Sequence, residues 1–271
     1  MKTERILVIR FSSLGDIILT VSFTKYLKNI FPDKEIFFLT KKKFSSLFSF
    51  FPVSVHPIFL ENYPSLWNLS KQLKKKEFSV IYDLHHNLRT NILKIFMLRK
   101  FHSYPKYRSY REKIIKNHIK QIHIHTIKSY FQAIPLEINH EEKWAPELNI
   151  QRESSNEILL GIHPGASRPT KQWPLEYLVE LIYMIEEQKK WKITVFAGPG
   201  EEEMVHEFYQ KFPHLKIVGP DLSLEDFILQ MSRQSFFLVN DSGPMHIAQA
   251  LNLPFLCLYG ATHPSLGFFP Y

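Results

Sequence analysis

The turn at residues 241–243 places an aspartate, a serine and a glycine between two apolar segments, and this combination can bind a phosphate. It follows a predicted strand at 236–239 and precedes a predicted helix at 245–251. Helix N-termini present free N–H groups and partial positive charge, and a glycine lets an anion approach the backbone. An Asp or Ser in this place is more often only a helix N-cap. His246, one turn into the helix, adds a second polar group and favours a binding function.

A carboxylate occupies the corresponding place near the start of the chain. A buried parallel strand is predicted at 6–11, a loop at 12–16 and an amphipathic helix at 17–31 that ends before Pro32. Asp16 therefore lies where the strand passes into the helix. It is either an N-cap or a carboxylate in the crevice above the strand ends, where open α/β sheets bind their ligands.

The usual phosphate and metal motifs are missing. The glycines at 198 and 200 resemble part of a dinucleotide fingerprint, but the third glycine is absent and three glutamates follow at 201–203. These carboxylates would repel a pyrophosphate, although one of them could hydrogen-bond a ribose hydroxyl. None of the six aspartates forms an Asp-x-Asp pair. A leaving diphosphate would then need protein cations and N–H dipoles, and Lys171, in a loop above a strand end, is either such a cation or an ordinary surface lysine.

Composition narrows the class of protein. The chain has 271 residues, of which 45% are hydrophobic, enough for two α/β domains with sizeable cores and too apolar for disorder. The formal net charge of +8 favours an anionic partner, which can be a phosphorylated substrate, a nucleic acid or an acidic membrane face. The single cysteine, Cys257, allows no disulfide within the chain, and its apolar surroundings favour a small buried hydrophobe over a nucleophile.

Two basic stretches have compositions that could suit a membrane surface or a nucleic acid. The first residues do not form a signal peptide and no apolar run of about 18 residues occurs, so any membrane contact is expected to be peripheral. Residues 41–51 mix lysines with phenylalanines, as a lipid-binding patch or a core segment would. Residues 94–128 interleave cations with tyrosines, but no nucleic-acid-binding motif accompanies them, and we expect no nucleic acid partner. The histidines at 118, 123 and 125 do not have zinc-site spacing.

The alternation of strands and helices restarts after a polar segment at 137–155, which we interpret as a linker. Each half then begins with its own strand, at 6–11 and at 158–163. The order of strand, loop, helix and strand is typical of a doubly wound α/β sheet. The sequence therefore predicts two Rossmann-like domains, at 1–150 and 151–271.

Five elements, in this order, together carry a family resemblance: ILVIRFSSLGDIILT, HPGASRPTKQWP, GPGEEE, DLSLEDF and VNDSGPMHIAQALNLP. With them the chain resembles glycosyltransferase family 9, the lipopolysaccharide heptosyltransferases, across nearly its whole length. The resemblance implies a GT-B fold, in which two Rossmann-like domains face a central cleft. It also implies inverting, metal-independent transfer of a heptose from an ADP-activated donor to a lipid A–inner core acceptor. No cofactor is implied, and the enzyme is expected to be cytoplasmic, in peripheral contact with the anionic face of the inner membrane.

The resemblance also implies a role for individual residues. Asp16 would be the general base that takes the proton of the acceptor hydroxyl. The donor would be held by residues of the second half, with the acceptor bound mainly to the first. By position these are Ser167 and Lys171 on the diphosphate, Glu201 on the ribose, Leu222 at the adenine, Asp241 on the sugar, Ser242 and Gly243 on a phosphate, and His246 beside them.

Two features of the chain depart from the family pattern. Family members run on for some tens of residues beyond the segment that ends here at Tyr271, so the chain is expected to be truncated or a naturally short member. Residues 101–139 match only loosely, which leaves the acceptor open. The alternative is a catalytically inactive relative that binds nucleotide-sugar or glycan. An NAD(P)-dependent oxidoreductase is disfavoured by the broken glycine motif.

Overall fold

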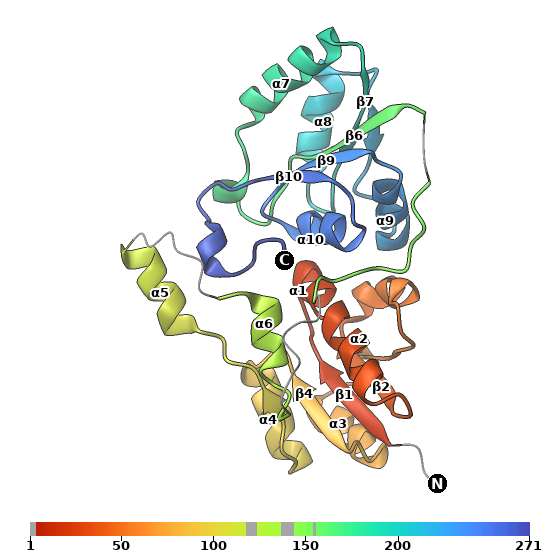
Figure 1. The fold of residues 1–271 in the computed structure, drawn as a ribbon, viewed down its shortest axis with the longest axis vertical. Coiled ribbons are helices and arrows are strands. Elements are labelled where there is room, and N and C mark those ends of the chain that lie inside the picture. The colour runs from red at the N-terminus through yellow and green to blue at the C-terminus, as the bar shows by residue number, and fades with distance from the viewer. Residues whose placement is uncertain (1–3, 118–123, 137–143, 154–155) are drawn as a thin grey trace. The chain divides into compact units, whose positions relative to one another are not determined.

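The computed structural model describes residues 4–117, 124–136, 144–153 and 156–271, and Figure 1 draws them as a ribbon. The chain divides into two compact units. Unit 1 contains residues 1–149 together with Ser265–Phe269 and Tyr271, and unit 2 contains Ile150–Pro264 together with Pro270. The boundary at 149/150 lies next to the expected one, whereas residues 265–269 pack with unit 1 and not with the half to which we had assigned them.

Unit 1 is built on a parallel sheet of five strands in the order β3-β2-β1-β4-β5. Its strands are β1 (Arg5–Ile9), β2 (Glu35–Thr40), β3 (His56–Phe59), β4 (Val80–Asp83) and β5 (His102–Ser103). Its helices are α1 (Leu14–Leu19), α2 (Val21–Ile30), α3 (Leu66–Lys75), α4 (Leu88–Met97), α5 (Arg108–Asn117) and α6 (Thr126–Phe131), with short 3₁₀ helices η1 (Lys42–Phe50) and η2 (Leu60–Asn62).

Helices cover both faces of this sheet. Successive side chains of a strand point to opposite faces, and both sets are buried here, so both faces need a cover. On one face, α3 and α4 pack Leu69, Leu73, Leu93 and Met97 against the strands. On the other, Phe23 of α2 contacts the rings of Tyr82 on β4 and Phe131 on α6. The α4 side chains that point away from the sheet are therefore left at the surface.

Unit 2 has the same architecture, with a parallel sheet of five strands in the order β10-β9-β6-β7-β8. Its strands are β6 (Ile158–His163), β7 (Trp191–Phe196), β8 (Lys216–Val218), β9 (Phe236–Asn240) and β10 (Phe255–Leu258). Its helices are α7 (Leu175–Glu187), α8 (Glu202–Lys211), α9 (Leu224–Ser232) and α10 (Gly243–Ala250), with the short η3 (Pro169–Lys171). The short η4 (Pro264–Leu266) begins at Pro264 of unit 2 and continues into the residues that belong to unit 1. One core joins α7 and α8 to the sheet, and Phe196 packs its ring against Phe227 of α9.

Three sequence-based expectations need correction or completion. The helix expected at 17–31 is two helices, which meet at Thr20, the C-cap of α1 and N-cap of α2. The Thr20 hydroxyl donates to the carbonyl of Ile17 at 2.6 Å. The phenylalanines of 41–51 pack into the core: Phe44, Phe50 and Phe51 are buried. The half-buried Phe48 packs against Phe38 and Phe51, so a core segment is favoured over a lipid-binding patch. His118, His123 and residues 137–143 and 154–155 of the expected linker lie outside the described residues.

Candidate functional site

Asp16 lies in the first turn of α1, directly after the carboxyl end of β1. Ser13 is the N-cap, and both its backbone N–H and its hydroxyl donate to Oδ2 of Asp16, at 3.0 and 2.8 Å. Arg10, the first residue after β1, places Nη2 2.5 Å from the same oxygen. The Asp16 side chain is only 17% exposed, so the carboxylate is fixed on one side by three donors.

The other oxygen of Asp16 is almost unoccupied. In the described part of the chain, Oδ1 receives one long hydrogen bond, from the Tyr130 hydroxyl at 3.5 Å. Burial alone would raise the pKa of Asp16, but the Arg10 charge and the Ser13 hydrogen bonds outweigh it and lower that pKa. Asp16 is therefore ionised at neutral pH, with Oδ1 as the oxygen able to accept a proton.

Arg10 is itself held in place. Its Nε donates to the Ser12 carbonyl at 2.8 Å, and its Nη1 donates to the Leu84 carbonyl at 2.5 Å, directly after β4. Burial opposes the charge of Arg10, but its neighbours Tyr130 and Asp16 raise its pKa, so it stays a cation. The loops after β1 and β4 are thus tied together around the carboxylate.

Other basic groups surround this carboxylate. Burial, together with the charges of Arg10 and Arg108, lowers the pKa of Lys106 to about 8. Burial, with Arg10 and Lys106 nearby, lowers the pKa of His85 to about 4, so that imidazole is neutral at pH 7. Its Nδ1 is buried and has no hydrogen-bond partner among the described residues. These groups offer an anion or a hydroxyl several donors beside Asp16.

All the residues predicted to bind a donor lie at the carboxyl-terminal edge of the sheet of unit 2. They follow β6, β7, β8 and β9 in turn, which places them where parallel α/β sheets bind ligands. The structure brings some of them into direct contact and leaves others as neighbours along the edge. Asp16 belongs to unit 1.

Lys171 and Asp241 form the best-defined contact at this edge. Lys171 ends η3 in the loop after β6, and its Nζ lies 2.7 Å from Oδ2 of Asp241, which follows β9. The Thr262 hydroxyl donates to the same oxygen at 2.6 Å. Lys171 is 22% and Asp241 10% exposed, so Lys171 is an anchored cation and no ordinary surface lysine.

A close backbone approach holds this contact together. Gly260, in the loop after β10, lies against η3, where Ala261 N donates to the Thr170 carbonyl at 2.8 Å. A Cβ on Gly260 would lie 2.5 Å from that carbonyl oxygen. Only a glycine therefore lets the segment with Thr262 approach the segment with Lys171.

Ser242 is the N-cap of α10, yet its side chain makes no capping hydrogen bond. Its Oγ is buried and has no partner among the described residues. Gly243 begins the helix, followed by Pro244, which has no N–H to leave unpaired, and His246 is buried one turn further on. The Ser242 hydroxyl is thus a buried polar group at this edge that no described protein group satisfies.

Glu201 is enclosed by three neighbours. Its Oε2 accepts a hydrogen bond from Gly198 N at 2.7 Å and lies 3.4 Å from Nε2 of the buried His163. A Cβ on Gly165 would lie 1.7 Å from Oε1 of Glu201, so the carboxylate fills the space that this glycine leaves. Burial raises the pKa of Glu201 and lowers that of His163 to about 4.

Ser167 and Leu222 are exposed on the same edge. Ser167 lies in the loop after β6 and Leu222 in the turn between β8 and α9, where its side chain is 42% exposed. Cys257, on β10, is half-buried, and burial raises the pKa of its thiol to about 12, so it is no nucleophile at neutral pH.

Several residues that contact the predicted site residues were not predicted from the sequence. Arg10 was not among the residues predicted for the site, although a cation directly after a buried strand is a signal for a buried partner. Thr262, His163 and Tyr130 gave no signal, because their roles depend on contacts between segments far apart in the sequence.

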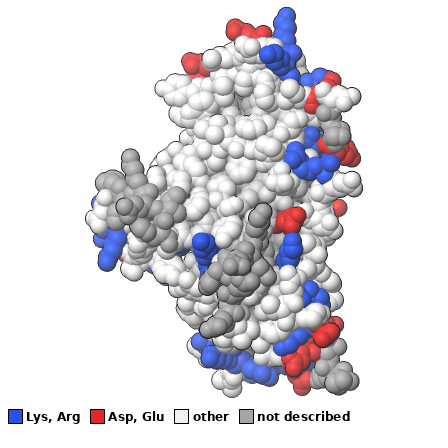
Figure 2. All heavy atoms as spheres, in the orientation of Figure 1, with Lys and Arg blue, Asp and Glu red and all other residues white. Residues whose placement is uncertain are grey.

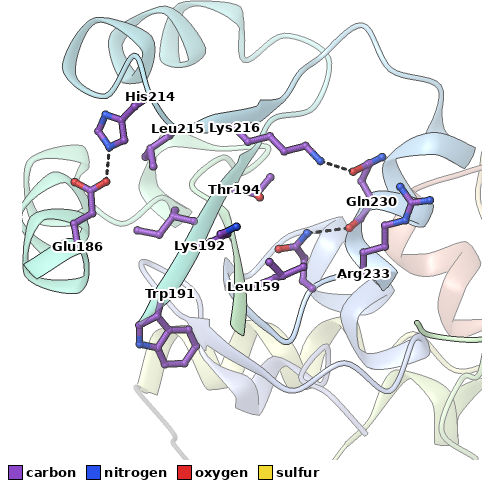
Figure 3. Close-up of a pocket in the computed structure, with 12 residues that line it drawn as sticks. Leu159, Glu186, Trp191, Lys192, Thr194, His214, Leu215, Lys216, Gln230 and Arg233 are labelled. Carbon is purple, nitrogen blue, oxygen red and sulfur yellow. Dashed lines mark hydrogen bonds and ion pairs between the residues drawn. The ribbon is translucent and has the colours of Figure 1, made fainter. Parts of the chain in front are cut away.

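A separate cavity of about 410 Å³ lies at the opposite, amino-terminal edge of this sheet, lined by the first residues of β7 and β8. Figure 3 shows His214 directed to Glu186 and Lys216 directed to Gln230 there. No residue predicted to bind a donor lines it.

The part of the chain that the structure describes contains no group of three His, Cys, Asp or Glu side chains placed to hold a metal ion, and a metal-independent reaction remains a prediction. None of the described helices is both long enough and apolar enough to cross a membrane.

Relatives of known name match most of the chain. A lipopolysaccharide heptosyltransferase 1 of Campylobacter coli is 24% identical over 95% of this chain and 84% of its own length. A lipooligosaccharide heptosyltransferase 2 of Campylobacter jejuni is 26% identical over 92% of this chain and 78% of its own.

Solved structures agree on the fold. The glycosyl transferase family 9 protein of Veillonella parvula superposes with a TM-score of 0.80, at 21% identity, over 100% of this chain and 86% of that one. The ADP-heptose heptosyltransferase II of Escherichia coli gives 0.76, also at 21% identity, over 96% and 86%. The expected GT-B fold class, with two Rossmann-like α/β units, is confirmed.

The model of glycosyltransferase family 9 (heptosyltransferase) matches residues 66–269, three quarters of the chain. This confirms the resemblance seen in the five motifs. The chain belongs to glycosyltransferase family 9 and is a glycosyltransferase of the heptosyltransferase type.

Proposed function

We propose that this enzyme transfers a heptose from an ADP-activated donor to a hydroxyl of a lipopolysaccharide inner-core acceptor, with inversion and without a metal ion. Its relatives are named for heptose transfer in lipopolysaccharide and lipooligosaccharide synthesis, and one E. coli heptosyltransferase structure contains ADP. The donor, the acceptor and the stereochemistry are proposals for this chain.

Asp16 is the proposed general base. The acceptor oxygen attacks the anomeric carbon, the bond from that carbon to the diphosphate breaks, and the acceptor proton passes to Oδ1 of Asp16. Arg10 and Ser13 hold Oδ2, which fixes the direction in which Oδ1 points. A single displacement of this kind inverts the anomeric centre and leaves ADP as the second product.

Unit 2 is the proposed donor-binding domain. Lys171 and the N-terminus of α10, with Ser242 and Gly243, stabilise the charge that develops on the diphosphate. Asp241 bonds the sugar and Glu201 the ribose, while Ser167 bonds the diphosphate, Leu222 lines the adenine pocket and His246 completes the wall. Support comes from the position of all these residues at the ligand-binding edge of one parallel sheet.

Unit 1 is the proposed acceptor-binding domain. The inner-core acceptor is anionic, and the cations Arg10, Lys106 and Arg108 near Asp16 suit such a ligand. An acceptor that carries lipid A is anchored in a bilayer, so we also propose peripheral contact with the anionic, cytoplasmic leaflet of the inner membrane.

The observation that carries the proposal is the state of Asp16: an ionised carboxylate with one oxygen held by three donors and the other nearly free. The test incubates the purified chain with ADP-heptose and lipid A–core acceptor and follows the acceptor mass. A gain of one heptose with release of ADP supports the proposal, and other nucleotide-activated sugars define the donor.

The alternative, an inactive relative that binds donor or glycan, is distinguished by calorimetry. Titration with ADP and ADP-heptose, with and without acceptor, separates binding from turnover. Saturable binding without any product at all would replace the proposed function by the alternative.

A further inference from the structure

The outer face of α4 exposes a row of large apolar side chains. Leu98, Leu88 and Ile95 are 84%, 75% and 66% exposed, and no other large apolar side chain of the described residues is as exposed as these three. Leu88 and Ile95 are seven residues apart, so they lie along one side of the helix, away from the buried Leu93 and Met97, and Leu98 follows as the exposed C-cap residue of α4. Single exposed leucines are normal, whereas a row of three on one face indicates a binding surface.

The row continues onto α3. Trp67 of α3 is 49% exposed and its ring meets that of Phe96 on α4 edge-on, with the centroids 5.4 Å apart. The Nζ of Lys71 lies 5.1 Å from the centre of the Trp67 ring. The two helices therefore present one continuous surface, which we call the α3–α4 face.

Basic residues surround this face. Residues 65–100 contain eight Lys and Arg and two acidic residues, Glu77 and Asp83, so this segment carries +6 of the formal +8 charge of the chain. Asp83 is buried, and the helices α3 and α4 themselves contain no acidic residue. Figure 2 shows Lys and Arg gathered at the lower end of the view, where Figure 1 draws α4.

We propose that the α3–α4 face docks on an anionic bilayer, with Leu88, Ile95 and Leu98 entering the interface and Lys71, Lys94 and Arg99 lying among the headgroups. Apolar side chains rimmed by cations suit a surface that is apolar below and negatively charged above. A second copy of the chain suits it less, because two such faces would bring like charges together.

This inference deepens the proposed function, since it rests on an acceptor that is anchored in a membrane, and it assigns the contact to a particular surface. The segment at 41–51, which the sequence suggested for lipid contact, buries its phenylalanines. The α3–α4 face instead leaves its apolar side chains outside, and none of its residues belongs to the proposed catalytic or donor-binding set.

The first experiment measures vesicle binding in the absence of acceptor, so its outcome does not depend on transferase activity. The full chain is sedimented with vesicles of phosphatidylcholine alone and with phosphatidylglycerol added. We expect binding only to the anionic vesicles, weaker at high salt because the charges are then screened. Leu88→Gln/Ile95→Gln/Leu98→Asn should lower the partition coefficient at least tenfold; Asn suits residue 98, whose φ is 53°.

Matched controls lie on unit 2. Tyr177→Gln/Met184→Gln removes two side chains of α7 that are 51% and 63% exposed, on a helix with four glutamates, and should leave binding within twofold. Lys94→Gln/Arg99→Gln should weaken low-salt binding at least fivefold, whereas Lys190→Gln/Lys211→Gln, with the same change in net charge, should not.

Turnover gives an independent readout. With a water-soluble acceptor fragment the apolar triple variant should keep kcat/KM within twofold, and with acceptor embedded in vesicles it should lose at least tenfold. Wild-type binding by the triple variant would overturn the inference. So would sedimentation-velocity evidence that the face instead forms a dimer, abolished by the same three substitutions. Vesicle binding without any transfer would leave the docking face intact and refute the proposed function alone.

Discussion

The guanidinium of Arg10 lies 2.5 Å from Oδ2 of Asp16, and this ion pair is largely buried, with side chains 9% and 17% exposed. Both residues follow β1, Arg10 directly and Asp16 one turn into the next helix. Because Ser13 donates to the same oxygen, Oδ2 has its partners while Oδ1 retains its capacity to accept. The arrangement makes Asp16 a well-oriented but weak base.

Asp16→Asn should abolish most of the transferase activity. The amide keeps the size of the side chain but cannot take a proton, so kcat should fall by about 10²–10⁴-fold. The affinity for ADP, measured by calorimetry, should stay within threefold, because Asp16 belongs to unit 1. Asp33→Asn, which changes an exposed carboxylate of the same unit, is the control. Normal turnover by Asp16→Asn would remove Asp16 from the mechanism.

Replacing Arg10 should change the pH dependence of the reaction. The folded-state pKa of Asp16 is lowered, so removing the cation raises that pKa and the acidic limb of kcat/KM moves to higher pH. Arg10→Lys retains the charge and should move this limb much less than Arg10→Met.

Arg10→Met also leaves a buried carboxylate without its ion-pair partner, which costs about 3–5 kcal/mol of folding free energy. Urea unfolding therefore accompanies the kinetics, and the pH profile is recorded only on folded protein. An unchanged acidic limb in Arg10→Met would show that Asp16 does not titrate in the reaction.

The sequence was sufficient for the βα alternation, the two halves and most residues at the strand ends. Apolar runs such as 158–163 match strand β6 at both ends, because a strand buried on both faces is a continuous apolar segment. The helices α3 and α4 were not predicted. In α4, apolar residues appear on inner and outer faces alike and blur the helical period, whereas α3 has a clear amphipathic pattern that was overlooked.

Contacts between segments far apart in the chain could not be predicted from the sequence. Lys171 and Asp241 are 70 residues apart, and Thr262 joins them from the loop after β10 only because Gly260 permits the approach. The enclosure of Glu201 by Gly165 likewise depends on how two loops pack. Residue types predicted which side chains have suitable chemistry, while packing decided which of them meet.

Lys171→Met should slow transfer, because it removes the cation that stabilises the negative charge on the leaving diphosphate. We expect kcat to fall by about 10²-fold or more, with weaker binding of ADP. Because Lys171 also neutralises Asp241 at 2.7 Å, the double variant with Asp241→Asn should show non-additive effects. The control is Lys190→Met, at an exposed position of the same unit. If the ADP affinity and kcat of Lys171→Met stay within twofold of wild type, Lys171 has only a structural role.

Gly165→Ala should weaken donor binding while leaving the fold intact. The new methyl would lie 1.7 Å from Oε1 of Glu201, the end of a flexible side chain that can move away at little cost. If Glu201 bonds the ribose, its displacement should lower ADP affinity about tenfold, measured by calorimetry. Gly219→Ala adds the same methyl where no atom lies within 4 Å, and should change nothing. Equal ADP affinity in both variants would argue against a role for Glu201.

His163 should make the protein sensitive to mild acid. Its Nδ1 lies 3.1 Å from the Gly165 carbonyl, which can only accept, so Nδ1 carries the proton of the neutral ring. Burial lowers its pKa from 6.5 to about 4. A lowered folded-state pKa stabilises the fold above the unfolded value of 6.5, and this stabilisation is lost as the pH falls from 6.5 towards 4.

The loss attributable to His163 amounts to about 3 kcal/mol of unfolding free energy, at about 1.4 kcal/mol for each pKa unit. Urea unfolding at pH 7.5, 5.5 and 4.5 measures it as the difference between wild type and His163→Asn, whose amide can still donate to Gly165 but does not titrate in this range. The variant should start less stable and lose less on acidification, because it has no buried imidazole to protonate. His206→Gln, which removes an exposed histidine of α8, should retain the wild-type dependence. Parallel curves for wild type and His163→Asn would mean that His163 has the same pKa in the folded and unfolded protein, against the effect of its burial.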